Sequence, residues 1–355
     1  MSSYYPPCGV FSTKYATDQA ILKTKFQWFL LIGFLIFMLL FPPLFFRGYM
    51  LGLIMICFIF TIAVLGLYFQ TGLCGQINIG QGAFMAVGAY ACAILIDKVG
   101  VNFWVAVPLA GICSSIIGAL FGISATRLKG FYLLIATLAA HFLIIWVLTN
   151  WTGLTGGIHG ITVPAPAIGG FVFSSNKSLY IPLYIITVLM VFFAKNIGRS
   201  RIGRAFIAVR DNDIAADLMG VNVFRYKLLS FMVSSFYAGV AGALYATYMT
   251  GVNVDFFTLN MSIWFIAMLI VGGMNSVVGA ILGTFFIQIT NELVATIIVP
   301  SVVSALPIIG SNLESGMPLI IFALILIVFL IYEPRGISHR WEVFKEYYRL
   351  YPFPF

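Results

Sequence analysis

The stretch GYMLGLIMICFIFTIAVLGLYF, Gly48–Phe69, contains no charged side chain. A helix of this length crosses the hydrocarbon core of a bilayer, which needs about 20 apolar residues. Similar blocks recur along the 355-residue chain, in which 61% of residues are hydrophobic and 8% are charged. A soluble domain does not need so large an apolar fraction, because a single core stops growing at such lengths. The sequence therefore predicts an all-α polytopic membrane protein, whose helices satisfy the backbone polar groups.

About ten apolar blocks are expected to form transmembrane helices. The eighth and tenth are short, and whether the eighth spans the bilayer fully or is broken or re-entrant stays open. The predicted spans are Phe26–Phe46, Gly48–Phe69, Gln81–Ile96, Phe103–Thr126, Phe131–Asn150, Leu179–Ala194, Leu228–Tyr248, Leu259–Val271, Ala280–Ile298 and Pro318–Tyr332.

The distribution of basic residues gives the orientation, because cytoplasmic loops carry an excess of Lys and Arg. With ten spans and a cytoplasmic N-terminus, only Arg47, Lys98 and Lys177 lie outside, which leaves 16 of the 19 Lys and Arg residues inside. We therefore predict that both termini are cytoplasmic. Residues 1–25 form an N-terminal arm and residues 26–332 the transmembrane domain, with a cytoplasmic loop at 195–227. Residues 333–355 form a C-terminal tail.

Motifs for catalysis and for nucleotide binding are absent from the sequence. It has no HExxH, GxSxG or GxGxxG, and no Gly-Lys pair from which a Walker A motif could be built. We therefore expect a non-catalytic subunit without a metal site or a bound cofactor. A membrane enzyme would need a cluster of His, Asp or Glu. A stand-alone channel or secondary transporter would be expected to carry more ionisable residues within its spans.

Glycine-rich breaks interrupt the apolar pattern at Gly66–Tyr90 and Val271–Gly283. Irregular backbone at membrane depth persists only where protein buries it or where it lines a wet cavity. Neutral polar side chains at Gln76, Asn78 and Gln81 favour contact with a solute or a second subunit. The alternative is a tight turn with close helix packing.

Two further polar residues are assigned to the same pathway or permease interface. Asn275 belongs to the second break, and Glu292 lies in the stretch FFIQITNEL. For Glu292, a pathway role and a simple hydrogen-bonded carboxyl are equally favoured. Gly279 and Gly283 have the small-residue spacing that permits close helix approach. Packing alone accounts for this spacing and is favoured, and the same spacing would also permit pairing with a second permease.

The loop at 195–227 contains a short predicted helix within RDNDIAADLMG, Arg210–Gly220. Asp211 or Asn212 is expected to cap its N-terminus, and Gly220 to end it. Its small and apolar residues suit a groove in a second protein better than a lipid surface. The residues assigned to this docking role are Asp213, Ile214, Ala215, Ala216, Leu218, Met219 and Gly220. A second long loop, 151–178, is predicted outside, where it either docks a soluble partner or closes the outer mouth.

Several blocks in family order resemble the LivM-like permeases of branched-chain amino acid importers. They are GQINIGQGAFMAVGAY, RLKGFYLLIATLA, NWTGLTGGIHGI, SRIGRAFIAVRDNDIAADLMGVNVFRYKLLSF, AGVAGALYA, VGGMNSVVGAILG and YEPRGI, and they cover residues 48–337. AADLMG resembles the AAxxxG core of the loop that docks ABC permeases on their ATPase. The glutamate of that motif is absent, and Gln81 stands where a histidine is common.

This resemblance implies a subunit of an ABC importer in the bacterial cytoplasmic (inner) membrane. The implied partners are a homologous second permease, two ATPase subunits that bind ATP and Mg²⁺, and a periplasmic or lipid-anchored solute-binding protein. Branched-chain or other hydrophobic amino acids are the expected solutes. Urea, short amides and aromatic acids are the alternatives, because related permeases carry them.

Overall fold

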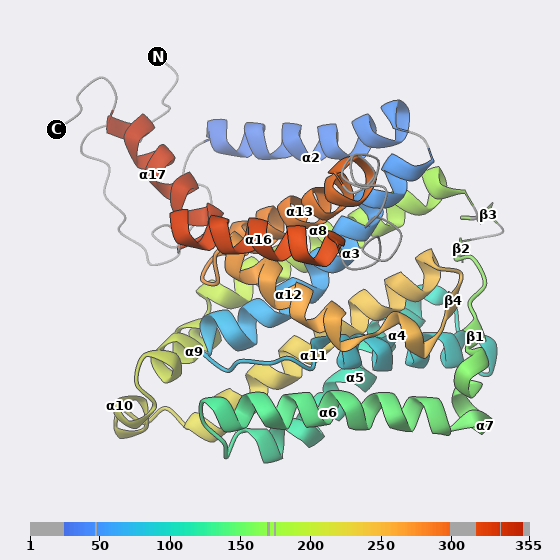
Figure 1. Ribbon diagram of the computed structural model, residues 1–355, viewed down its shortest axis with the longest axis horizontal. Coiled ribbons are helices and arrows are strands. Elements are labelled where there is room, and N and C mark those ends of the chain that lie inside the picture. The colour runs from blue at the N-terminus through green and yellow to red at the C-terminus, as the bar shows by residue number, and fades with distance from the viewer. Residues whose placement is uncertain are drawn as a thin grey trace, which may run out of the picture.

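The computed structural model describes residues 25–46, 48–168, 171–173, 175–298, 317–333 and 335–350. The described chain forms a bundle of helices that run largely side by side (Figure 1). Eight stretches are long and apolar enough to cross a membrane. They are formed by α2 (Lys25–Phe45), α3 (Tyr49–Leu67) with its π-helical continuation η1 (Tyr68–Leu73), α5 (Phe103–Ala125), α6 (Phe131–Asn150), α8 (Asn176–Arg199), α11 (Val223–Tyr248), η3 (Val254–Phe256) with α12 (Leu259–Gly272), and α13 (Val277–Leu293) with η4 (Val294–Ile298).

Two shorter helices account for the remaining predicted spans. α4 (Gln81–Asp97) has 17 residues and α16 (Met317–Tyr332) has 16. Each predicted range therefore falls on a helix, and the prediction of an all-α polytopic membrane protein is confirmed. The eighth span is a 14-residue helix, α12, extended at its start by the short turn η3.

The two ends of the bundle differ in content. In Figure 1, the start of α2, the loop helices α9 (Arg201–Asp211) and α10 (Asp213–Leu218), and α17 (Ile337–Leu350) lie at the left. The short strands lie at the opposite end. This arrangement agrees with a topology in which the 195–227 loop and the tail share one side. Residues 1–24 of the predicted arm and Arg47 lie outside the described residues.

The helix α11 is central and packs against α3, α4 and α5. Glycines let these backbones approach one another. A Cβ atom at Gly242 would collide with the Met85 carbonyl of α4. One at Gly239 would lie 2.6 Å from the Cβ of Ser114 on α5. At these two positions the helices of the bundle centre are therefore in backbone contact.

The helix α2 lies at the periphery, and two tyrosines of α8 hold it. Pro42 has no N–H, so the Met38 carbonyl four residues earlier lacks its helical donor. The Tyr180 hydroxyl donates to this carbonyl at 2.5 Å, and the Tyr184 hydroxyl donates to the Leu35 carbonyl at 2.9 Å. Because Pro42 leaves the Met38 carbonyl without a helical donor, this carbonyl is available to the Tyr180 hydroxyl, which attaches α2 to α8.

The two glycine-rich breaks meet at the inner end of the bundle. The first passes from η1 through an irregular segment, residues 74–80, to α4. The second is a tight turn between α12 and α13, where Gly273 has a φ of 108°. A Cβ atom at Gly72 would collide with the Met274 carbonyl, so the breaks touch. The predicted broken segment is confirmed for the first, whereas the second is the alternative turn.

The packing role predicted for Gly279 and Gly283 is confirmed, and their use in pairing with a second permease is wrong. A Cβ atom at Gly279 would lie 2.5 Å from the Gly272 carbonyl oxygen. One at Gly283 would collide with the Met268 carbonyl. Both glycines are buried by α12 of the same chain, so they bring α12 and α13 together and offer no surface to another subunit.

The outer loop is folded against the end of the bundle. It contains α7 (Thr152–Thr155), η2 (Gly157–His159), β1 (Ile161–Thr162), β2 (Ala167–Ile168) and β3 (Phe171–Val172). β1 pairs antiparallel with β4 (Gly251–Val252), and β2 pairs antiparallel with β3. Thr155 and Val163 are buried. The loop is thus structured, and its docking or closing role stays a prediction.

Candidate coupling surface and solute pathway

The helix α10 has well-formed caps at both ends. The Asn212 side-chain oxygen accepts from the backbone N–H groups of Ile214 and Ala215 at 3.1 and 3.0 Å, which resolves the choice of N-cap. At the other end Gly220 has a φ of 85° and its N–H donates to the Asp217 carbonyl. Val221 N–H donates to the Ala216 carbonyl, which completes a Schellman motif. This six-residue helix is therefore defined by its caps.

One carboxylate fixes α10 to the rest of the chain. Asp213 lies 2.6 Å from the Lys129 ammonium of the α5–α6 turn and 3.3 Å from Lys227 of α11. The hydrogen bond from Lys129 holds the pKa of the Asp213 carboxyl below its usual value. The helix start is thereby joined to two other elements at neutral pH.

The predicted docking residues of α10 divide between two faces. Ile214, Leu218 and Met219 have exposed fractions of 68%, 84% and 85%, and Ala215 is also exposed. Ala216 is 5% exposed and packs in the core of the chain. The prediction that Ala216 belongs to the outward face is wrong, because α10 turns that side inward. Three large apolar side chains nevertheless point away from the body.

The polar residues of the first break are buried, and other described parts of the chain supply partners for all of their side-chain amide groups except the Nε2 atoms of Gln70 and Gln76. Asn78 Nδ2 donates to the Gln70 and Gln81 side-chain oxygens at 2.9 and 3.3 Å. Gln81 Nε2 donates to the Ala63 carbonyl at 2.9 Å, and the Ser234 hydroxyl donates to Gln81 Oε1 at 3.1 Å. This amide network connects α3, the break, α4 and α11.

Gln76 extends the same network toward the inner end. Its side-chain oxygen accepts from the Ser230 hydroxyl at 2.8 Å. Gln76, Asn78 and Gln81 are 3%, 0% and 0% exposed. Asn78 and Gln81 therefore hold the break in shape, and the geometry does not support their assignment to a pathway or permease interface. Gln76 differs, because it also lines a cavity of about 340 Å³ with Arg210 and Lys227, and its Nε2 atom has no hydrogen-bond partner among the described residues.

Asn275 lies on the inner surface, where Arg210 contacts it. The Arg210 Nη1 atom donates to Asn275 Oδ1 at 2.6 Å and to the Gly72 carbonyl at 3.1 Å. Arg210 Nε and Nη2 donate to Asp211 Oδ1 at 3.1 and 3.0 Å. The sequence predicts only that Arg210 is one of the basic residues on the cytoplasmic side. No local pattern indicates that its side chain reaches both breaks.

Glu292 lies at the other end of the bundle, far from the amide network. The Tyr49 hydroxyl and the Thr296 hydroxyl donate to Glu292 Oε1. Tyr49 begins α3 and Glu292 ends α13, so this contact joins the outer ends of the two helices. The five predicted pathway residues therefore occupy three places.

One cavity is lined by Glu292, and a second cavity shares Gln288 with it. One, of about 340 Å³, is lined by Gly48, Tyr49, Gly52, Leu53, Ile56, Asn176, Tyr248, Gln288 and Glu292. The other, of about 240 Å³, is lined by Phe60, Tyr245, Phe256, Thr258, Asn260, Met261, Trp264, Phe265, Gln288 and Asn291. The first combines a carboxyl with phenols, and the second combines aromatic side chains with hydroxyl and amide groups.

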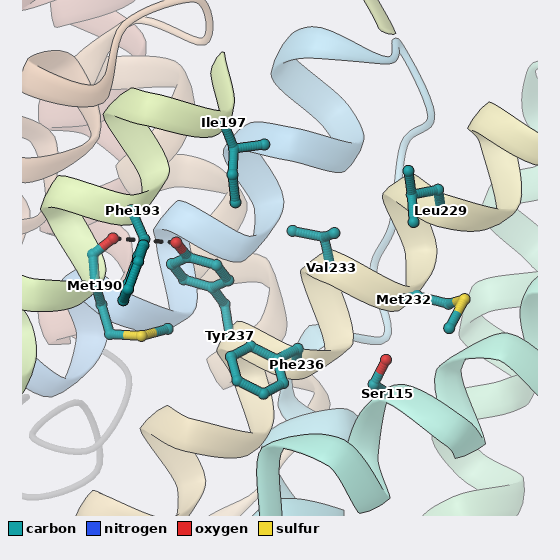
Figure 2. Close-up of a pocket in the computed structure, with 9 residues that line it drawn as sticks. All are labelled: Ser115, Met190, Phe193, Ile197, Leu229, Met232, Val233, Phe236 and Tyr237. Atoms are coloured by element: carbon teal, nitrogen blue, oxygen red, sulfur yellow. Dashed lines mark hydrogen bonds between the residues drawn. The ribbon is translucent and has the colours of Figure 1, made fainter. Parts of the chain in front are cut away.

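A third cavity, of about 330 Å³, lies among α5, α8 and α11 (Figure 2). Apart from Ser115 and Tyr237, its lining is apolar, and the Tyr237 hydroxyl donates to the Met190 carbonyl at 3.0 Å. No charged group lines it to hold the ammonium or carboxylate of a zwitterion. This cavity therefore offers no charged partner to a zwitterion, and the pathway role of Glu292 stays a prediction.

The amino-acid sequence of the chain is similar to that of a known protein family. The family described as "Branched-chain amino acid transport system / permease component" matches residues 49–332. The chain belongs to this family. The matched range begins with α3 and ends with α16, so it contains every element that forms the amide network, α10 and the outer cavities.

Individual members of the permease family are similar to the chain over most of its length. LivM of Salmonella typhimurium, a high-affinity branched-chain amino acid transport system permease protein, is 34% identical over 66% of this chain and 61% of that relative. LivM of Escherichia coli K12 is 31% identical over 78% of this chain and 70% of that relative. BraD of Pseudomonas aeruginosa, another such permease, is 26% identical over 81% of this chain and 93% of that relative. The chain thus spans 61% of the length of the Salmonella protein. No solved structure matches it.

Proposed function

We propose that the chain is the transmembrane permease subunit of an ABC importer for branched-chain or other hydrophobic amino acids. The exposed apolar face of α10 carries the proposal. Ile214, Leu218 and Met219 project from a helix whose caps and Asp213 ion pairs fix it in place. A rigid apolar face on an otherwise polar loop suits insertion into a groove of a partner protein. The partner is an ATPase subunit that carries ATP and Mg²⁺, since the sequence has no Walker A motif.

A second permease would cover the polar side of α13. In the described part of the chain, the side chains of Gln288 and Asn291 form no hydrogen bonds, and both are only partly buried. Such groups facing lipid are unfavourable, because hydrocarbon offers them no partner. A homologous chain facing this side would enclose the two cavities at Gln288. Solute delivered by an external binding protein would enter between the chains.

The outer cavities favour a zwitterion with an apolar side chain. Glu292 provides a carboxylate for an ammonium group, and the ring faces of Phe60, Tyr245 and Trp264 provide an apolar surface. The branched-chain permeases LivM and BraD support this class of solute. Urea and short amides have neither an ammonium group nor a branched side chain, and aromatic acids lack the ammonium group.

The test is uptake of radiolabelled leucine into proteoliposomes that contain the chain, a second permease, the ATPase and the binding protein. We expect uptake to require ATP and to be reduced by excess valine. Competition by urea, acetamide or benzoate instead of valine would assign the alternative solutes. Uptake by the chain alone, without ATP, would refute the importer and favour a stand-alone channel or secondary transporter.

Glu292→Gln separates the pathway role from a structural role. The amide keeps the size of the side chain and an acceptor for Tyr49, but it removes the negative charge. We expect normal amounts in the membrane with a higher KM for leucine. Tyr49→Phe removes the contact without the charge and is the matched control. Equal KM values for wild type and Glu292→Gln would contradict the proposed ammonium contact.

A further inference from the structure

Arg210 occupies the junction of four elements at the inner end of the bundle. It is the penultimate residue of α9, and the N-cap of α10, Asn212, follows two positions later. Its guanidinium contacts the Gly72 carbonyl in η1 and the Asn275 side chain in the α12–α13 turn. One side chain thus contacts both glycine-rich breaks and leads directly into α10.

The geometry of the guanidinium is fixed from the side of α9. Nε and Nη2 both donate to Asp211 Oδ1, which leaves the two N–H groups of Nη1 directed at Gly72 and Asn275. The guanidinium group is rigid and planar, so a displacement of the edge bonded to Asp211 also moves the edge bonded to Gly72 and Asn275. A lysine ammonium on its flexible chain would not couple the two sides in this way. The Arg210 side chain is 29% exposed, so protein surrounds most of it.

The backbone of the first break leaves room for this side chain. Gly75 has a φ of 72°, and a Cβ atom there would lie 2.7 Å from Arg210 Cγ. The helix α9 is itself seated by the buried residues Gly203, Phe206 and Val209. Arg210 therefore joins α9, which leads into α10, to both breaks.

The helices that Arg210 contacts at their inner ends are the ones joined at their outer ends. η1 continues α3. Asn275 comes directly before Ser276, which is the N-cap of α13. At the other end, Tyr49 of α3 donates to Glu292 of α13. α3 and α13 lie alongside each other through the bundle (Figure 1). Arg210 and the Tyr49–Glu292 contact thus lie at opposite ends of one helix pair.

We propose that Arg210 is the positioning residue through which displacement of α10 reaches α3 and α13, and through them the outer cavity at Glu292. This proposal rests on the proposed function, in which an ATPase moves α10. In the proposed function the ATPase contacts Ile214, Leu218 and Met219 and does not contact Arg210. The proposed role of Arg210 is therefore separate from ATPase docking. Loss of Arg210 should therefore leave the complex assembled but uncoupled.

The experiment compares Arg210→Met with Arg225→Met in the full complex. Arg225→Met removes an equal charge from the same loop, and among the described residues Arg225 has no hydrogen bond to either break. For Arg210→Met we expect the ATPase to copurify as in wild type and to hydrolyse ATP. We expect the leucine transported per ATP to fall at least tenfold. Arg225→Met should keep the wild-type ratio. An unchanged ratio in Arg210→Met would overturn the proposal.

Two further variants protect the test from a folding defect. Arg210→Lys keeps the charge but loses the fork, and it should uncouple nearly as strongly as Arg210→Met. Asn275→Ala removes one acceptor from an exposed turn, and it should uncouple partially and add little to Arg210→Met. If Arg210→Met does not reach the membrane, these two variants decide the matter. Normal coupling in both would refute the proposal.

Hydrogen exchange on the chain alone in nanodiscs separates failure of this proposal from failure of the proposed function. Arg210→Met should speed amide exchange in residues 68–80 and 272–279, and Arg225→Met should not. If the wild-type complex shows no ATP-dependent transport, the importer assignment fails, while faster exchange still establishes that Arg210 holds both breaks. If exchange is unchanged in both breaks, Arg210 holds neither and the link is wrong.

Discussion

Truncation of Leu218 to alanine is the most direct test of the α10 docking face. This side chain is 84% exposed in the isolated chain, so it gains nearly all of its burial from a partner. Burial contributes roughly 0.8 kcal/mol per CH₂ group, and Leu218→Ala removes about three carbon atoms. We therefore expect the affinity for the ATPase to fall by about 2 kcal/mol, which is roughly 30-fold in Kd.

The measurement is the binding of the ATPase subunit to the permease pair in nanodiscs, by biolayer interferometry. Val343→Ala on α17 is the control, because Val343 is 44% exposed on another helix at the same end. It should change Kd by about twofold or less, as substitutions outside an interface do. Both variants should keep the wild-type melting temperature. A change of less than threefold for Leu218→Ala would refute the docking role of this face.

Three further predictions concern the body of the permease and the seat of α10. Gly242→Val should lower the melting temperature by several degrees, because its Cβ atom would collide with the Met85 carbonyl. Gly33→Ala, which has nothing within 4 Å, should not. Gln81→Leu should reduce the folded amount in the membrane by fluorescence-detected size exclusion, since each buried partner left unpaired costs about 1–3 kcal/mol. Because the pKa of Asp213 is lowered, its ion pairs are intact above the ordinary aspartate value of about 4 and are lost only as pH falls through the lowered pKa. ATPase binding should therefore be flat between about pH 5.5 and 8, while Asp213→Asn should weaken it throughout that range.

The burial of Ala216 and Asn78 limits what a substitution at either position can test. Because Ala216 packs in the chain's own core, a long charged side chain there would disturb the fold as well as the interface. Asn78→Leu is affected in the same way. Asn78 is fully buried and bonded to Gln70, so loss of transport and loss of folded protein should occur together.

The sequence by itself determined the class of the protein, the positions of its helices and the place of α10. These features are local. The length of an apolar block indicates a spanning helix, and the excess of basic residues on one side orients it. The hydrogen bonds of the Asn212 and Gly220 caps each join residues no more than five positions apart in the chain. Each predicted span therefore coincides with a helix of the described chain, and the capped helix of the 195–227 loop is confirmed, whereas the number of spans and the sides of the termini stay predictions.

Only the tertiary structure decided which partner each of these residues meets. Gln81 bonds to Ser234, which lies 153 positions away, and Arg210 bonds to Gly72 and Asn275, 138 and 65 positions away. A glutamine or asparagine that is buried within the chain and one that faces a solute can have the same apolar neighbours in the sequence, so the sequence does not distinguish them. The same applies to Gly279 and Gly283, whose spacing suits contact with any helix, including α12 of the same chain. Helix formation depends on neighbours along the chain, whereas burial and pairing depend on which helices pack together.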